Sequence, residues 1–405
     1  MSTVIQAPAP ASPGGPKAPR AGVIRRFVEG DLASLRVFVV LGLIWAVFQF
    51  ENNHFLTAEN LTNLFLQITA VGLISVGVVY VLLLGEIDLS VGAVSGLASA
   101  ATAVLNVQHG WSPYTAILAG VLVGLVIGAV QGFLFTKFGI PSFVVTLAGL
   151  LTWQGALLKV LGDTGTVNLT DPKITGLANT FYSSTVSWII GIGVIAIYGG
   201  GTLLSWRRRV ASGLADQDLR GPLVRVILVS VATIAAILVV TADRGLPLAV
   251  LILLAFVAGM EYTATRTRFG RHVFAVGGNA EAARRAGIHI DRVRIAVFAI
   301  AGSMAAIGGI LAASRLLAVN QNSGGSDLLL LAIAGPVIAG TSLFGGRGSV
   351  WTALLGALVI GSISNGMDLL ALDSSVKYMV TGGVLLVAVI VDALARRQRQ
   401  AAGRV

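Results

Sequence analysis

Side chains able to carry out chemistry are scarce in this chain of 405 residues. Cysteine is absent, which excludes disulfides, thiolate nucleophiles and cysteine-bound metal ions. The four histidines are scattered without the spacing of metal ligands, so no metal site is predicted. None of the five lysines follows a glycine, as the lysine of a G-x4-G-K-[ST] phosphate loop must. We therefore predict no catalytic residue and no cofactor on this chain.

The densest cluster of charges lies within residues 263–294 and contains the sequence GNAEAARRAGIHIDRVR at 278–294. Glu281 precedes Arg284 and Arg285 by three and four residues, the favourable order for ion pairs on one face of a helix. The alanines favour a helix with little side-chain bulk, an asparagine can cap its start, and a glycine can end it. The residues of this predicted short helix are Asn279, Glu281, Ala282, Ala283, Arg284, Arg285 and Gly287.

Two interpretations of this segment stay open on spacing alone. The short helix either enters a groove on a soluble partner protein, or the segment is an ordinary solvated loop. In the second case its arginines only mark the cytoplasmic side of a membrane.

A second candidate is the sequence GEIDLSVGA at 85–93. Gly85 can end one helix, and Asp88 or Ser90 can cap the next. Capping and turn geometry explain this pattern, but so does a broken-helix turn that lines a transport path, with Glu86 and Asp88 as a gate. Both interpretations stay open.

The third candidate is the glycine-rich turn FGGRGS at 344–349. Arg347 could pair with a partner protein or with Glu86 or Asp88, or it could be a lone basic residue on the cytoplasmic side. A phosphate cradle is not expected, because the lysine is missing. The residues singled out in this turn are Gly345, Gly346, Arg347 and Gly348.

An apolar scaffold must position these turns. The chain is 55% hydrophobic and 11% charged, with a mean hydropathy of +0.87. Runs of about 18 or more apolar residues recur and predict membrane-spanning helices. The expected fold class is therefore an all-α polytopic membrane protein with about twelve transmembrane helices. The predicted spans are 36–50, 63–84, 89–106, 114–136, 141–160, 187–204, 224–242, 246–262, 295–313, 327–344, 350–367 and 376–392.

Basic residues support this topology. The chain has 28 Lys and Arg against 18 Asp and Glu, and such an excess in a membrane protein marks cytoplasmic loops rather than a nucleic-acid partner. With both termini cytoplasmic, 23 basic residues fall on the inner side and five on the outer side. No charged residue lies at the centre of a predicted span, which argues against a proton- or sodium-driven carrier. Pro336 lies inside its span and predicts a kink there.

The expected organisation has three parts. Residues 1–34 are rich in proline and alanine and are predicted to form a disordered cytoplasmic tail, without a cleaved signal peptide. Residues 35–395 form a single transmembrane domain, in which 263–294 is the main cytoplasmic loop. Residues 396–405 form a basic cytoplasmic tail.

The quoted motifs carry a resemblance to a known family. EAARRAG at 281–287 resembles the EAA-x3-G signature of the permease subunits of ABC importers. GEIDLSVGA and AGTSLFGGRGSV at 339–350 resemble hallmarks of the monosaccharide branch, whose members take ribose, xylose or galactose. The resemblance covers roughly 40–160 and 245–392, and an extra helix pair near 187–242 is similar to the longer xylose-type permeases.

The resemblance implies a core of about ten helices plus this extra pair, in the plasma (inner) membrane of a bacterium. It implies a permease subunit, not an enzyme, that imports a monosaccharide, with D-xylose as the expected sugar. The expected partners are a separate ATPase subunit, which binds ATP and Mg²⁺ and docks on the 263–294 loop, an extracytoplasmic sugar-binding protein, a second copy of the chain, and membrane lipid.

Six neutral side chains in the apolar segments could hydrogen bond to a sugar along the path, although bonding between helices would also explain most of them. They are Asn63, Gln67, Gln131, Trp153, Gln154 and Asn365. The alternative function is an ion-coupled secondary sugar carrier or channel that works without an ATPase partner.

Overall fold

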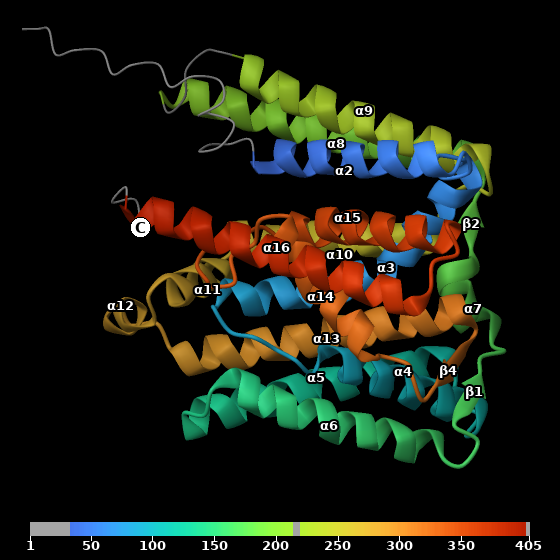
Figure 1. Cartoon of the computed structure of the whole chain (residues 1–405). Coiled ribbons are helices and arrows are strands. Elements are labelled where there is room, and N and C mark those ends of the chain that lie inside the picture. The colour runs from blue at the N-terminus through green and yellow to red at the C-terminus, as the bar shows by residue number, and fades with distance from the viewer. Residues whose placement is uncertain (1–32, 214–218, 402–405) are drawn as a thin grey trace, which may run out of the picture.

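The computed structural model describes residues 33–213 and 219–401, which fold into a helical bundle with very short strands (Figure 1). The helices are α2 (Ala33–Glu51), α3 (Ala58–Leu83), α4 (Val91–Val107), α5 (Pro113–Phe138), α6 (Ser142–Leu161), α7 (Pro172–Asn179), α8 (Ser184–Ala211), α9 (Arg220–Ala242), α10 (Leu248–Arg266), α11 (Arg268–Gly278), α12 (Ala280–Arg285), α13 (Ile290–Leu316), α14 (Ser326–Ile338), α15 (Trp351–Leu369) and α16 (Ser374–Ala401). The predicted disordered tail at 1–34 lies outside the described residues except for its last two positions, which begin α2. The predicted basic tail begins within α16, and its last four residues lie outside the described part.

Eight helices of the described ranges are long and apolar enough to cross a membrane. They are α3, α5, α6, α8, α9, α10, α13 and α15. Shorter apolar stretches occur in α2, α4, α14 and α16. Each predicted apolar segment coincides with one of these helices, which confirms the helical membrane class. The number of crossings and the side on which each terminus lies stay predictions.

The predicted span at 327–344 is too long, because α14 ends at Ile338. Pro336 lies inside this helix, in its last turn, two residues before α14 ends. A proline lacks the N–H that an interior turn needs. The chain then turns at Gly340, whose φ of +108° lies in the left-handed region that glycine tolerates.

Helices α3 and α13 form the centre of the bundle, and 89% and 61% of their most apolar stretches are buried. The predicted extra pair, α8 and α9, lies with α2 along one side (Figure 1) and is only 17% and 11% buried over the same kind of stretch. Helix α12 projects at one end of the bundle, here called the α12 end.

Short strands close the opposite end, here called the β end, and the sequence did not predict them. Strand β1 (Thr166–Asn168) pairs antiparallel with β4 (Ala318–Asn320), so that Val167 lies opposite Val319. Strand β2 (Phe181–Tyr182) pairs with β3 (Leu246–Pro247).

Small residues bring the central helices into backbone contact, as a membrane bundle without a hydrophobic driving force requires. A Cβ added at Gly77 of α3 would lie 2.8 Å from the Ala301 Cα of α13. On α5, a Cβ at Gly124 or Gly128 would collide with the Gly302 or Phe298 carbonyl oxygen of α13. Glycine at these positions lets α5 and α13 touch.

We expect Gly128→Ala to lower the free energy of unfolding by about 1–3 kcal/mol, because the new methyl group forces α5 away from α13. Gly193→Ala on α8 is the matched control, since nothing lies within 4 Å of its added Cβ. Thermal unfolding of both purified variants in the same detergent measures the difference. An equal melting temperature would show that α5 and α13 need no backbone contact.

Candidate functional site: the junction at the α12 end

The predicted short helix exists as α12, and its local geometry follows the sequence. The Asn279 side chain accepts a hydrogen bond of 3.0 Å from the Ala282 N–H and so caps the helix. Glu281 lies 3.8 Å from Arg284 and 3.2 Å from Arg285. The helix ends before Gly287, whose φ is +82°. A partner protein can reach these three charged side chains, because 59–80% of each is exposed.

The small alanine face is only partly free. Ala283 is only 4% exposed and belongs to the core cluster. Its carbonyl oxygen also accepts a hydrogen bond of 3.1 Å from the Ile288 N–H. Helix α12 therefore packs on the bundle through Ala283 and the partly buried Ala280, whereas its charged side chains face outward.

The three candidate motifs meet beside α12 at a contact made of backbone. The Gly346 N–H donates a 2.9 Å hydrogen bond to the Leu83 carbonyl oxygen at the end of α3. A Cβ added at Gly277, near the end of α11, would overlap that same Leu83 oxygen. A Cβ at Gly345 would lie 2.7 Å from the Gly277 oxygen and 2.8 Å from the Gly85 nitrogen. We call Leu83, Gly85, Gly277, Gly345 and Gly346 the glycine junction.

Positive φ values shape the turns of the glycine junction. The φ angles of Gly85, Gly345 and Gly346 are +76°, +83° and +72°, which side-chain-bearing residues rarely adopt. Gly85 thus ends α3 as predicted. The sequence indicated the individual turns, but not that they touch one another.

Glu86 forms an ion pair with Arg294 at the start of α13, at 2.9 Å. The alternatives named for Arg347 stay predictions. The Arg294 guanidinium also lies 5.4 Å from the centre of the Phe135 ring on α5. Only 27% of the Arg294 side chain and 17% of the Glu86 side chain are exposed, so this pair is better shielded from water than those of α12.

Asp88 and Ser90 do not cap α4 in the expected way. Ser90 stands at the N-cap position, but its side chain makes no capping bond. Instead the Asp88 carboxylate accepts the Ser90 N–H at 2.8 Å and the Ser90 hydroxyl at 2.6 Å. Burial raises the pKa of the Asp88 carboxyl, and these two hydrogen bonds oppose the rise.

The same hydroxyl reaches Gln131 of α5, whose Oε1 lies 3.0 Å from Ser90 Oγ. Asp88, Ser90 and Gln131 are 5%, 0% and 2% exposed, and we call them the buried lock. One hydroxyl proton cannot serve two acceptors fully. Turning the Gln131 amide over would let its NH₂ donate to Ser90 and leave the Ser90 proton for Asp88.

The turned amide would also serve Trp153 of α6. Within the described ranges, neither Gln131 Nε2 nor Trp153 Nε1 has a hydrogen-bond partner. Both nitrogens adjoin Gly149, where an added Cβ would collide with Gln131 Nε2 and lie 3.0 Å from Trp153 Nε1. An amide oxygen on this side could accept the indole N–H. Of the six predicted path residues, these two are therefore close together.

Two further predicted path residues, Asn365 and Gln154, bond within the chain. Asn365 exchanges two hydrogen bonds with Asn60, of 2.8 Å and 3.0 Å, and so joins α15 to α3. Gln154 donates to the Gln321 carbonyl oxygen at 3.0 Å. The contact between Asn365 and Asn60 supports the alternative that amides bond helix to helix, whereas Gln154 bonds to the loop after β4. Gln67 is partly buried on α3.

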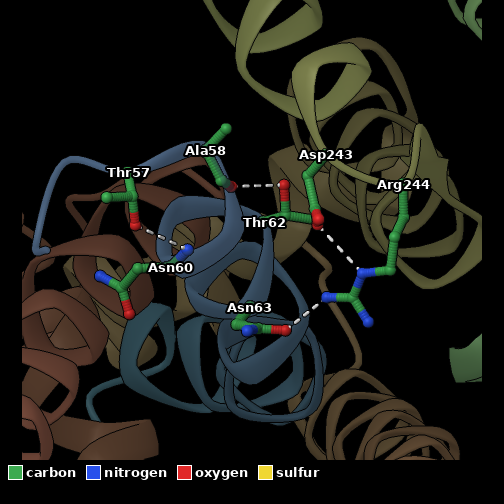
Figure 2. A network of polar contacts seen from close by, with 7 residues as sticks. All are labelled: Thr57, Ala58, Asn60, Thr62, Asn63, Asp243 and Arg244. Carbon is green, nitrogen blue, oxygen red and sulfur yellow. Dashed lines mark hydrogen bonds and ion pairs between the residues drawn. The ribbon is translucent and has the colours of Figure 1, made fainter.

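Asn63 accepts a hydrogen bond of 2.5 Å from Arg244, which also pairs with Asp243 at 3.0 Å (Figure 2). Arg244 follows α9, so this contact ties the extra helix pair to α3. Nothing in the spacing of the residues indicated this contact, because Arg244 was only one of the five basic residues predicted on the outer side.

Glu261 near the end of α10 is a site residue that sequence reasoning missed. Its Oε2 accepts the Ser349 hydroxyl at 3.0 Å and the Val350 N–H at 2.8 Å, and so fixes the end of the 344–349 turn. The one feature of the sequence that could have pointed to Glu261 is the position of an acidic residue in the last turn of an apolar segment. In the part of the chain that the structure describes, no three His, Asp or Glu side chains could hold a metal ion.

We expect Asp88→Ala to lower the free energy of unfolding by about 2–4 kcal/mol, because it leaves the buried Ser90 N–H without an acceptor and removes the shorter hydrogen bond of the Ser90 hydroxyl. Asp88→Asn keeps an acceptor oxygen and should cost less. Asp163→Ala, in an exposed loop, is the control. Thermal unfolding in detergent compares the three variants, and similar melting temperatures for Asp88→Ala and Asp163→Ala would show that the buried lock does not stabilise the fold.

The proteins and the family that this chain resembles are all described as permease components of transport systems. Residues 60–389 match the family described as branched-chain amino acid transport system / permease component. The chain is 38% identical to the xylose transport system permease protein of Escherichia coli (strain K12), over 90% of this chain and 93% of that protein. It is 32% identical to the ribose import permease protein of Bacillus subtilis (strain 168), over 90% and 94% of the two chains. It is 30% identical to the D-allose permease of E. coli K12, over 88% and 90%.

No solved structure matches the chain. The relatives are permease proteins of transport systems rather than enzymes, which agrees with the prediction that this chain catalyses no reaction. The extent of the family match, together with the apolar helices, identifies the chain as a membrane permease. The chain belongs to the family described as the permease component of the branched-chain amino acid transport system, which agrees with its resemblance to the permease subunits of ABC importers.

Proposed function

We propose that the chain is the permease subunit of an ATP-driven importer of a monosaccharide, and that the sugar is D-xylose. Relatives named for xylose at 34–38% identity support the sugar, and those named for ribose and allose, at 28–32%, support the wider class. The observation that carries the ATP coupling is the placement of α12, exposed on its charged side and joined through α11 to the glycine junction.

In this proposal an ATPase subunit grips α12, and the α12 end faces the cytoplasm of a bacterium. ATP and Mg²⁺ bind to that subunit, since this chain lacks a phosphate loop. A rotation of α12 moves α11, and the backbone contact between Gly277 and Leu83 passes the movement to the end of α3. Backbone contact suits this role because no side chain in it can change rotamer and absorb the shift.

Asp88 and Ser90 of the buried lock follow the end of α3 directly in the sequence. We propose that it opens when Gly85 and Glu86 move, and that the donors of Gln131 and Trp153 then meet hydroxyl groups of the passing sugar. Neutral donors suit a neutral polyol, and a few such bonds permit release. A second copy of the chain and an extracytoplasmic sugar-binding protein complete the proposed importer.

Uptake of labelled D-xylose into proteoliposomes tests this function. We expect uptake only when the permease is combined with its ATPase subunit, its sugar-binding protein and ATP, and we expect an ATP analogue that resists hydrolysis to abolish it. Uptake by the permease alone, driven by an ion gradient, would identify a secondary carrier. Excess unlabelled ribose or allose should compete poorly, and equal competition would contradict the assignment to xylose.

Two adjacent glycines provide a matched test of the coupling route. Gly277→Ala places a methyl group on the Leu83 oxygen, whereas nothing lies within 4 Å of a Cβ at Gly278. We expect Gly277→Ala to lower sugar-stimulated ATP hydrolysis about tenfold, and Gly278→Ala to leave it near the original rate. Membrane levels and melting temperatures of both variants separate lost coupling from lost folding. Normal stimulation in a folded Gly277→Ala variant would contradict the route through the junction.

A further inference from the structure

A hollow of about 560 Å³ lies at the α12 end between the extra helix pair and the core. Its walls come from the last three turns of α8 and from the last residue of α10. The lining residues are Gly201, Leu204, Ser205, Arg208, Arg209 and Arg266. Three arginines from two helices that are distant in sequence thus converge on one space with an apolar wall.

The charges of this hollow are not neutralised by the described chain. Among residues 33–213 and 219–401, no carboxylate forms an ion pair with Arg208, Arg209 or Arg266. Three like charges facing one space repel one another, so an anion there is favoured. A guanidinium presents parallel N–H groups that match the oxygens of a phosphate.

The side chains of α8 around the hollow change from apolar to basic, as is typical of the interface between membrane and water. Toward the middle of α8 the exposed side chains are apolar, among them Ile197 (79% exposed), whereas Arg207 to Arg209 follow at its end. Trp206 lies at this transition, where aromatic residues collect in membrane proteins. Gly200 and Gly201 leave open space within 4 Å of an added Cβ, which provides room for a hydrocarbon chain along the helix.

We propose that this hollow binds an anionic phospholipid, with its phosphate between Arg208, Arg209 and Arg266 and its acyl chains along the apolar side of α8. Basic pockets between helices at a membrane surface are suited to such headgroups. The apolar wall favours a lipid over free inorganic phosphate, which would gain nothing from it. The bound lipid would hold α8 against α10 at the end where α8 and α9 have few buried residues.

The proposal is tested on the purified permease in a neutral detergent, by following the melting temperature during titration with phosphatidylglycerol. We expect a saturable rise in melting temperature that neither phosphatidylcholine nor inorganic phosphate reproduces. The triple variant Arg208→Gln, Arg209→Gln, Arg266→Gln should need on the order of 100-fold more phosphatidylglycerol for half of the effect. The single variant Arg266→Gln should need roughly fivefold more, which keeps the test valid if the triple variant fails to fold.

The charge-matched control changes Arg207, Arg225 and Arg271 to Gln, since these arginines lie at the same end but do not line the hollow. It should respond like the unmodified protein. An unchanged response in Arg266→Gln, or an equal loss in the control, would overturn the site. Equal stabilisation by phosphatidylcholine would overturn the preference for anionic lipid, and equal stabilisation by inorganic phosphate would assign the hollow to a free anion instead.

Discussion

Direct contact between backbones is the constraint on which this structure depends. In the bundle centre, Gly128 of α5 lies against the Phe298 carbonyl oxygen of α13, and Gly77 of α3 lies against Ala301. At the α12 end the same principle recurs between Gly277 and Leu83. Apolar side chains would gain little by leaving lipid, so close approach, with dispersion contacts over many atoms, must hold the helices together.

Local features were the most predictable ones. The apolar segments, the cap by Asn279 and the ion pairs of Glu281 depend on residues within one helical turn of each other, so the sequence contains what fixes them. The excess of small residues also indicated close packing. Helix α14 differs from its predicted span because hydropathy continues past Pro336, whereas the backbone hydrogen-bond ladder stops close to it.

Contacts between distant segments were not predictable. Nothing in the spacing indicates that Glu86 meets Arg294, that Glu261 holds Ser349, or that Gly346 donates to the Leu83 oxygen. Each depends on how helices pack in three dimensions. The buried lock differs from the expected caps for the same reason, since Ser90 bonds to Asp88 and contacts Gln131 of another helix.

The pairing of β2 with β3 bears on how the extra helix pair is attached. The chain leaves the core at Tyr182 and re-enters it at Leu246, and these two residues are direct neighbours across the ladder. The whole of α8 and α9 is therefore an excursion that starts and finishes at one place. The pair thus has the architecture of an insertion at a single point of the core, fastened a second time where Arg244 meets Asn63.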